Sequence, residues 1–303
     1  MLITKLKFTI KRSVFYLYAR LKYYYPVWIL FNTEGVHLLK KNRPRLSDTQ
    51  VRILNDLKEN GVATTSLEEL FPNEDMLHVL QDYEKEQKGN RKQYHKKKFF
   101  VDYWEKIPEL DLDNPFVKIM TDTRILDVVN SYMGMYSQII FYTLQMTDTT
   151  PNNAERTYSQ NWHRDPQEQK FCKVFIYLND VDENTGPFVY LPKSAHGQKY
   201  GKLFPVSPPK GSYPSKEDVD KLLPMDEVKT MTGTAGTVLF CDTMGIHRGG
   251  YATKHPRIMS TFAFGAKTFR ENISYWYSPA TKKELQKLTP QVQFSIKKKY
   301  LRT

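Results

Sequence analysis

The spacing of hydrophobic residues predicts helices in the first part of the chain. Ser47 and Gln50 form a capping box, which predicts that a helix begins here, and Asn60-Gly61 is a typical helix end. Between these signals, apolar residues recur at the interval that buries one face of a helix. The same pattern predicts three more helices: a short one beginning at Ser66, one over residues 74–88 and one over residues 116–132.

From residue 137 onward the apolar runs become shorter and richer in β-branched and aromatic residues. Gly, Pro, Asn and Asp separate these runs, as they separate strands. The expected strands are 139–146, 173–178, 188–191, 237–240 and 258–264. Several short strands divided by turns indicate a mainly β protein with flanking helices, built as a sandwich or a double-sheet jelly roll.

The amino-terminal residues 1–33 combine helical apolar spacing with basic charge. Their apolar positions are Leu6, Ile10, Val14, Leu17 and Leu21. No uncharged run here approaches the roughly 20 residues of a membrane-spanning helix, and a signal-peptide cleavage site is missing. The pattern suits a helix lying in a membrane interface and equally a helix packed across the main domain. The sequence leaves both open, and peripheral membrane contact through residues 1–33 stays an alternative.

Composition narrows the class of protein. A chain of 303 residues can form one large or two modest domains, and 40% hydrophobic with 26% charged residues excludes a disordered or integral membrane protein. Cys172 and Cys241 are the only cysteines, which excludes a disulfide framework and a cysteine-rich zinc site and fits a reducing cytoplasm. The oligomeric state is not readable.

The net charge of +12 could attract nucleic acid, anionic lipid or an acidic substrate. The basic residues form clusters within residues 1–33, 91–98 and 297–302. No nucleic-acid-binding motif accompanies them, so solvated basic surfaces are the simpler interpretation and no specific nucleic acid partner is expected.

Two histidines and an aspartate carry the candidate chemistry. His163 and Asp165 lie in the segment NWHRD, and His247 follows in GIHRGG. If the first two lie on a strand, its period of two places both side chains on one face. Two histidines and one carboxylate form the facial triad that holds non-haem Fe(II) and leaves coordination positions open. Arg257 follows in HPRIMS, and its planar guanidinium can bind a carboxylate in a bidentate manner.

The segments SQNWHRD, KVFIYLNDVDENTGPFVYLPKSAHG, GTAGTVLF and IHRGGYATKHPR resemble the phytanoyl-CoA dioxygenase family of Fe(II)/2-oxoglutarate-dependent oxygenases. The resemblance implies a double-stranded β-helix (a cupin-like jelly roll) that binds Fe(II), the co-substrate 2-oxoglutarate and O2. It also implies that His163, Asp165 and His247 bind the iron and that Arg257 anchors the far carboxylate of 2-oxoglutarate. The expected activity is hydroxylation of an unactivated C–H bond in a small-molecule or lipid-like substrate, with release of succinate and CO2. Desaturation or ring closure would need only a different substrate position.

The resemblance covers most of residues 45–270. It predicts one catalytic domain there, with a helical part at 45–135 and the jelly roll at 136–270. Residues 1–44 are expected to form a basic, aromatic extension, and residues 271–303 a basic helical one.

Other residues near the expected site are candidates for contact with 2-oxoglutarate or substrate. They are Gln145, Tyr142 and Lys173, on strands that should flank the metal. Some family members place a serine or threonine near the arginine, where this chain has Gly249 and Met259. Arg257 is therefore expected to rely on Thr237, a tyrosine or water.

The long segment 197–228 is expected to contain a short helix beginning at Ser215 and to act as a lid over the substrate.

The alternative function for the whole protein is that of a catalytically silent jelly roll that binds an anionic ligand or a membrane surface. An intact triad with Arg257 favours the enzyme.

Overall fold

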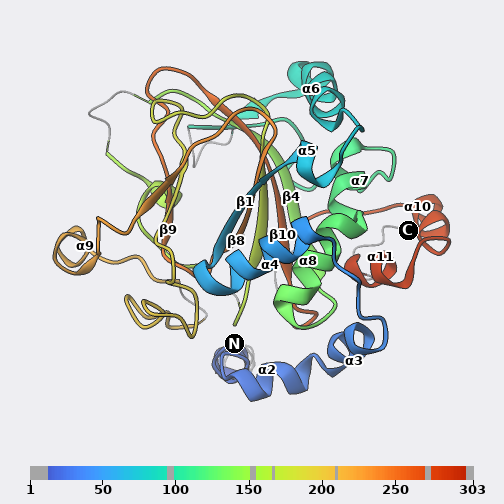
Figure 1. The fold of residues 1–303 in the computed structure, drawn as a ribbon, viewed down its shortest axis with the longest axis horizontal. Helices are drawn as coiled ribbons and strands as arrows, with labels where there is room; N and C mark the ends of the chain where they lie inside the picture. Colours follow the sequence, from blue (N-terminus) through green and yellow to red (C-terminus); the bar gives the residue numbers. More distant parts are fainter. Residues whose placement is uncertain are drawn as a thin grey trace, which may run out of the picture.

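Two antiparallel sheets face each other in the centre of the molecule (Figure 1). The computed structural model describes residues 13–93, 99–150, 155–165, 168–208, 211–269 and 274–297. Leu6 and Ile10 of the expected amino-terminal helix lie outside these residues, as do most of the basic clusters at 91–98 and 297–302.

The larger sheet has the strand order β1-β8-β5-β10-β4-β3-β2, and the smaller has the order β7-β6-β9. The strands are β1 (Val62–Ser66), β2 (Lys92–Gln93), β3 (Phe100–Asp102), β4 (Gln138–Thr147), β5 (Cys172–Tyr177), β6 (Phe188–Tyr190), β7 (Lys229–Met231), β8 (Thr237–Asp242), β9 (His247–Gly249) and β10 (Arg257–Gly265). An apolar cluster joins the sheets, with Phe175, Tyr177 and Leu239 on one side and Phe188 and Tyr190 on the other. This arrangement is the jelly roll predicted from the strand pattern. The strand β1 was not predicted, although its β-branched residues follow a clear turn at Gly61.

Helices cover the outer face of the larger sheet. They are α4 (Asp48–Asn60), α5 (Leu67–Leu70), α6 (Met76–Gln87), α7 (Pro115–Thr121) and α8 (Thr123–Met133). The Ser47 capping box is present, and Gly61 ends α4 with φ 75°, in the left-handed region that favours glycine. The single helix expected over 116–132 is wrong: the chain breaks at Asp122, whose carboxylate accepts a hydrogen bond from the Arg124 N–H and caps α8.

Strand alternation divides the larger sheet into two faces with different roles. Phe262, Val174 and Leu144 point toward the helices and belong to the main apolar core. Their neighbours along each strand point toward the smaller sheet. The second face is therefore the one available to a site inside the jelly roll.

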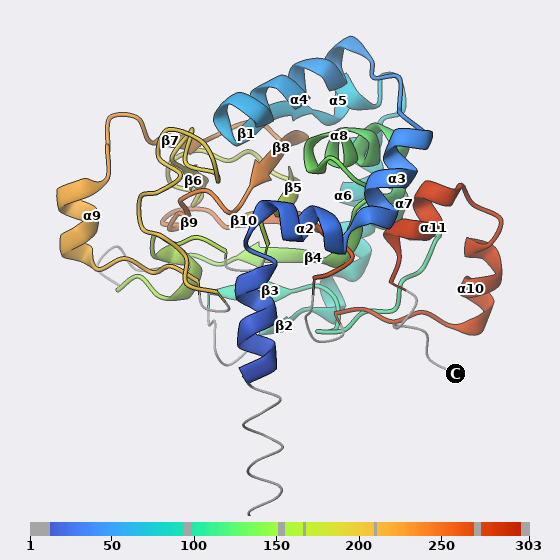
Figure 2. The same ribbon diagram turned by 90° about the horizontal axis from the view of Figure 1, so that it is seen from below.

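Terminal helices flank the two sheets without encircling them (Figure 2). Residues 13–21 are helical and lead into α2 (Tyr25–Phe31) and α3 (Thr33–Lys41), while α10 (Pro279–Leu285) and α11 (Pro290–Ser295) follow the last strand. Pro26 occupies the first turn of α2, where its missing N–H costs nothing. In the described part of the chain, no helix combines the length and the apolar character needed to cross a bilayer.

Candidate metal centre

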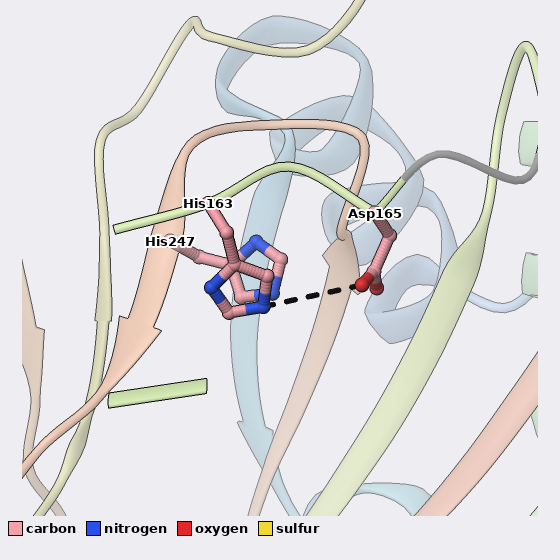
Figure 3. Close-up of side chains that lie close together, drawn as sticks. All are labelled: His163, Asp165 and His247. Atoms are coloured by element: carbon pink, nitrogen blue, oxygen red, sulfur yellow. Dashed lines mark ion pairs between the residues drawn. The ribbon is translucent and has the colours of Figure 1, made fainter. Parts of the chain in front are cut away.

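The backbone brings the three predicted ligands together. His163 and His247, the first residue of β9, exchange two backbone hydrogen bonds, of 2.9 and 3.0 Å. Asp165 donates its backbone N–H to the Thr243 carbonyl oxygen at 3.0 Å. His163 and Asp165 are two residues apart in an extended segment, so both side chains point to the same side, as expected (Figure 3).

The side chains converge with geometry that suits one metal ion. One ligand atom from each of His163, Asp165 and His247 lies within 4.8 Å of the others. The Nδ1 atom of His163 lies 2.8 Å from the Asn161 carbonyl oxygen, and Nδ1 of His247 lies 3.0 Å from that of Gly245. These contacts orient both rings and leave Nε2 as the ligand atom, which is how metal-binding histidines are commonly held.

The electrostatics of the group also fit a divalent cation. Burial alone would raise the pKa of Asp165, but the Lys173 ammonium and the two imidazoles lower it below its ordinary value. Burial, and then the neighbouring His163, lowers the pKa of His247 well below its usual range. An ionised carboxylate and a neutral imidazole are the protonation states that metal binding requires. The Lys173 Nζ atom lies 2.7 Å from Asp165 Oδ2, so this predicted residue touches a metal ligand.

Arg257 is buried on the same inner face of the larger sheet. Its guanidinium donates to the Gly186 carbonyl oxygen and, at 3.2 Å, to the Thr147 hydroxyl, and it also interacts with the Tyr177 side chain. Its Nε atom has no hydrogen-bond partner, and among the described residues no carboxylate pairs with it. A buried cation without an anion is costly, so this position is suited to a carboxylate from a bound molecule.

A short chain of side chains links Arg257 to the metal ligands. The Tyr177 hydroxyl accepts a hydrogen bond from the Phe188 N–H at 3.3 Å, and the Phe188 ring lies 5.5 Å from the ring of His247. Arg257 is therefore connected to the metal ligand His247 through Tyr177 and Phe188. Of the helpers expected for Arg257, a tyrosine is present and Thr147 takes the place considered for Thr237.

The other two candidates for contact with 2-oxoglutarate or substrate, Gln145 and Tyr142, lie on opposite faces of β4. Gln145 lies opposite Met259 in the β4–β10 pairing, on the inner face, and its amide donates to Asp102 at 2.7 Å. Tyr142 was wrongly placed at the site. It points into the helix-covered core, where its hydroxyl donates to the Glu109 carbonyl oxygen at 2.9 Å. Residues three apart on a strand cannot share a face, so the sequence itself argued against combining Tyr142 with Gln145.

A sequence model described as phytanoyl-CoA dioxygenase (PhyH) matches residues 63–259, more than half of the chain. The chain belongs to the phytanoyl-CoA dioxygenase family. It is accordingly a non-haem Fe(II)/2-oxoglutarate-dependent oxygenase, as the motifs indicated.

Solved structures of similar fold support the same architecture. The epimerase SnoN, crystallised with Fe3+, alpha-ketoglutarate and nogalamycin RO, has a TM-score of 0.52 and 14% identity, with 74% of this chain and 86% of SnoN covered. The carbocyclase SnoK has a TM-score of 0.52 and 15% identity, with 82% and 92% covered. EctD from S. alaskensis, crystallised with bound Fe, has a TM-score of 0.51 and 15% identity, with 77% and 82% covered. At these identities the similarity shows the fold, and it confirms the jelly roll. A search of curated proteins finds no significant match by sequence.

Two features of this family member were not predicted. The ring of Tyr213, from the expected lid segment, stacks on the ring of His163 with centroids 5.2 Å apart and planes 5° apart. Arg164, between two metal ligands, is buried and donates to the carbonyl oxygens of Ser194, Tyr200, Leu203 and Met244. Arg164 thus connects residues 200–203, in the segment expected to form a lid, to the extended segment that carries His163 and Asp165.

The lid segment also has a structural role. Its helix α9 (Lys216–Leu222) begins at the predicted cap Ser215. Phe204, Val219 and Leu223 pack with Trp162 and Val189 against the outer face of the smaller sheet. Among the described residues of the segment, those around Tyr213 reach the metal centre.

Proposed function

We propose that this oxygenase hydroxylates an unactivated C–H bond of a small-molecule or lipid-like substrate and releases succinate and CO2. The observation that carries the proposal is the convergence of His163, Asp165 and His247 beside a buried arginine that has no acidic partner among the described residues. A protein that only binds an anionic ligand could use the arginine, but it would have no need for a metal-ligand set beside it.

In this proposal His163, Asp165 and His247 hold Fe(II), and Arg257 holds the far carboxylate of 2-oxoglutarate. Thr147 and Tyr177 orient the guanidinium, and Gln145 borders the co-substrate from β4. Bound iron with 2-oxoglutarate and O2 supplies the oxidising power for C–H hydroxylation.

Lys173 acts on Asp165 in this arrangement. Its ammonium binds Oδ2, which fixes the carboxylate so that the other oxygen points at the metal position. The rings of Phe141 and Phe171 lie 5.6 and 5.4 Å from the same ammonium and shield it from water. We therefore assign Lys173 to positioning of a ligand, in place of direct contact with 2-oxoglutarate.

The substrate enters beside Tyr213 in this proposal, because that ring lies over His163 and is 60% exposed. The structural relative SnoN was crystallised with nogalamycin RO, which shows that the fold can hold a small organic molecule. A cytoplasmic setting is proposed because both cysteines are free and buried.

Anaerobic addition of Fe(II) and then 2-oxoglutarate tests the proposal. The natural chain should develop a weak visible charge-transfer band, and Asp165→Ala should lose it, whereas Asp220→Ala on the exposed face of α9 should keep it. Arg257→Lys keeps the charge and loses the planar fork, so the concentration of 2-oxoglutarate needed for half of the band should rise at least about tenfold. A colourless natural chain would identify the catalytically silent binding protein instead, and a band that survives Asp165→Ala would show that Asp165 is not a required iron ligand.

A further inference from the structure

The described chain concentrates its exposed apolar side chains in one short stretch of sequence on consecutive helices. Of the 15 large hydrophobic residues that are exposed, eight lie between residues 14 and 31. We define the N-terminal apolar surface by these residues: Val14, Phe15, Leu17, Leu21, Tyr24, Tyr25, Leu30 and Phe31. Single exposed apolar residues are ordinary, but a concentration of this kind marks an interaction site.

The helices that carry this surface are anchored firmly to the enzyme by their other face. Trp28 is fully buried, and its Nε1–H donates to Glu168 Oε2 at 2.6 Å. Lys22 forms an ion pair of 2.9 Å with the same carboxylate, and the Tyr18 hydroxyl donates to the Thr268 carbonyl oxygen at 3.0 Å. The outward apolar side chains are thus held in position by a built contact, and their exposure does not reflect a helix that has failed to pack.

The charge around the surface is basic. Before Glu34 the charged side chains of the sequence are all Lys or Arg; within the described residues 13–33 they are the exposed Arg20 and Lys22, which is buried and paired with Glu168. Lys40 and Lys41 close the last turn of α3, which follows directly. Apolar and aromatic residues interleaved with cations are the pattern of helices that lie in the headgroup region of anionic bilayers.

We propose that the N-terminal apolar surface binds an anionic lipid bilayer. Charge complementarity favours this partner, because a bilayer that contains phosphatidylserine offers both negative headgroups for the basic flanks and an apolar interior for the leucines and tyrosines. The two alternatives left open by the sequence then apply to different faces of the same helices: one face packs on the enzyme, and the other contacts the membrane.

The surface adjoins the metal end of the barrel. Glu168, which anchors Lys22 and Trp28, follows the ligand Asp165 by three residues. Tyr23 packs against the cluster that contains Phe171, and the Phe171 ring lies 5.4 Å from the Lys173 ammonium that binds Asp165. A bilayer at this surface would bring lipid-like substrates near the metal site. This consequence rests on the proposed hydroxylation. The proposed membrane binding does not depend on the hydroxylation.

Flotation of the full chain with lipid vesicles tests the binding. The chain should float with vesicles of phosphatidylcholine mixed with phosphatidylserine, and weakly or not at all with phosphatidylcholine alone, and added salt should weaken the binding. Leu17→Glu combined with Leu30→Glu should weaken it at least about tenfold, because two apolar side chains no longer enter the bilayer. Val79→Glu, at an exposed position of α6, is the matched control and should bind as the natural chain does.

Three results would overturn the proposal. The first is a failure to float with either vesicle, and the second is an equal loss of binding in Val79→Glu. The third is a dimer, detected by light scattering, that the Leu17→Glu/Leu30→Glu variant abolishes, because this would assign the surface to a second copy of the chain. Asp165→Ala should float normally, so a failure of the proposed hydroxylation and a failure of membrane binding give different results.

Discussion

At the scale of single residues, the metal centre depends on neighbours that hold each ligand in one orientation. Backbone carbonyl oxygens fix the two imidazoles, and a lysine from β5 fixes the carboxylate. Lys173 reaches Asp165 because strand alternation points it toward the smaller sheet, opposite to the buried Cys172 and Val174 beside it.

Replacing Lys173 with Met should weaken metal binding by about 10- to 100-fold, the usual effect of removing a partner of a ligand. The methionine preserves most of the buried volume but cannot donate to Asp165. Titration with Co(II), followed by its visible spectrum, measures the affinity without requiring turnover. Lys173→Arg keeps a donor and should recover part of the affinity; if both variants bind metal like the natural chain, Lys173 has no positioning role.

Tyr213 should control access of substrate to the metal. Tyr213→Ala removes the ring over His163, and we expect kcat/KM for the substrate to fall about tenfold, a change of about 1.4 kcal/mol in transition-state stabilisation. The affinity for 2-oxoglutarate, read from the charge-transfer band, should stay the same because Arg257 is untouched. Tyr213→Phe separates the ring from its hydroxyl and should behave as the natural chain does.

Tyr213→Ala tests the lid more specifically than a deletion of residues 200–214 would. The carbonyl oxygens of Tyr200 and Leu203 bind Arg164, and Phe204 belongs to a buried cluster, so such a deletion would also damage the fold. An unchanged kcat/KM in Tyr213→Ala would argue against the lid.

At the scale of elements, close packing at the turn before β9 positions His247. A Cβ atom added at Gly245 would lie 1.9 Å from the Tyr190 hydroxyl, which itself donates to the Asp242 carbonyl oxygen at 3.1 Å. The Gly245 carbonyl oxygen in turn orients the His247 ring. The glycine is needed here for space, and the turn that it permits sets the direction of a metal ligand.

Gly245→Ala should therefore lower both stability and metal affinity. Overpacking against a buried tyrosine costs about 1–3 kcal/mol of unfolding free energy, measured by urea denaturation. Co(II) affinity should fall in the same variant because His247 moves. Gly89→Ala adds a Cβ where no atom lies within 4 Å and should leave both quantities unchanged; equal effects of the two substitutions would contradict this account.

At the scale of the whole molecule, polar contacts join the terminal helices to the barrel. The carboxylate of Glu168, with its side chain 0% exposed, joins the amino-terminal helices to the segment that follows the ligand Asp165. At the other terminus, the Gln138 amide of β4 donates to the Phe294 carbonyl oxygen of α11 at 3.3 Å. We propose that residues 45–270 form the catalytic domain and that both extensions are parts of one cooperative unit with it.

Lys22→Met should destabilise the enzyme by about 3–5 kcal/mol, because it leaves the buried Glu168 carboxylate without its cation. The double variant Lys22→Met/Glu168→Leu removes both charges and should recover much of this loss. Urea denaturation followed by tryptophan fluorescence measures both values, and Trp28 in the amino-terminal helices is one of the four tryptophans that contribute to the signal. If the single variant unfolds like the natural chain, the extension is not part of the cooperative unit.

The sequence alone determined the features that depend on neighbours along the chain. Ser47 and Gly61 predicted the two ends of α4 because capping is local, and short runs of β-branched and aromatic residues between turn residues predicted five strands of the jelly roll. The motif around His163 and Asp165, with His247 and Arg257, predicted which residues would gather. The break at Asp122 also depends on a local signal, because Asp122 caps α8. The apolar periodicity of residues 116–132 instead predicted one continuous helix.

Only the tertiary structure decided which face of each strand meets the helices and which meets the smaller sheet. That choice follows from pairing between strands far apart in sequence, so it placed Lys173 on Asp165 and turned Tyr142 away into the helix-covered core. It also placed Tyr213 over His163 and exposed one face of the amino-terminal helices. Local patterns determine which elements form, whereas burial of their faces against distant partners determines which side chains share a site.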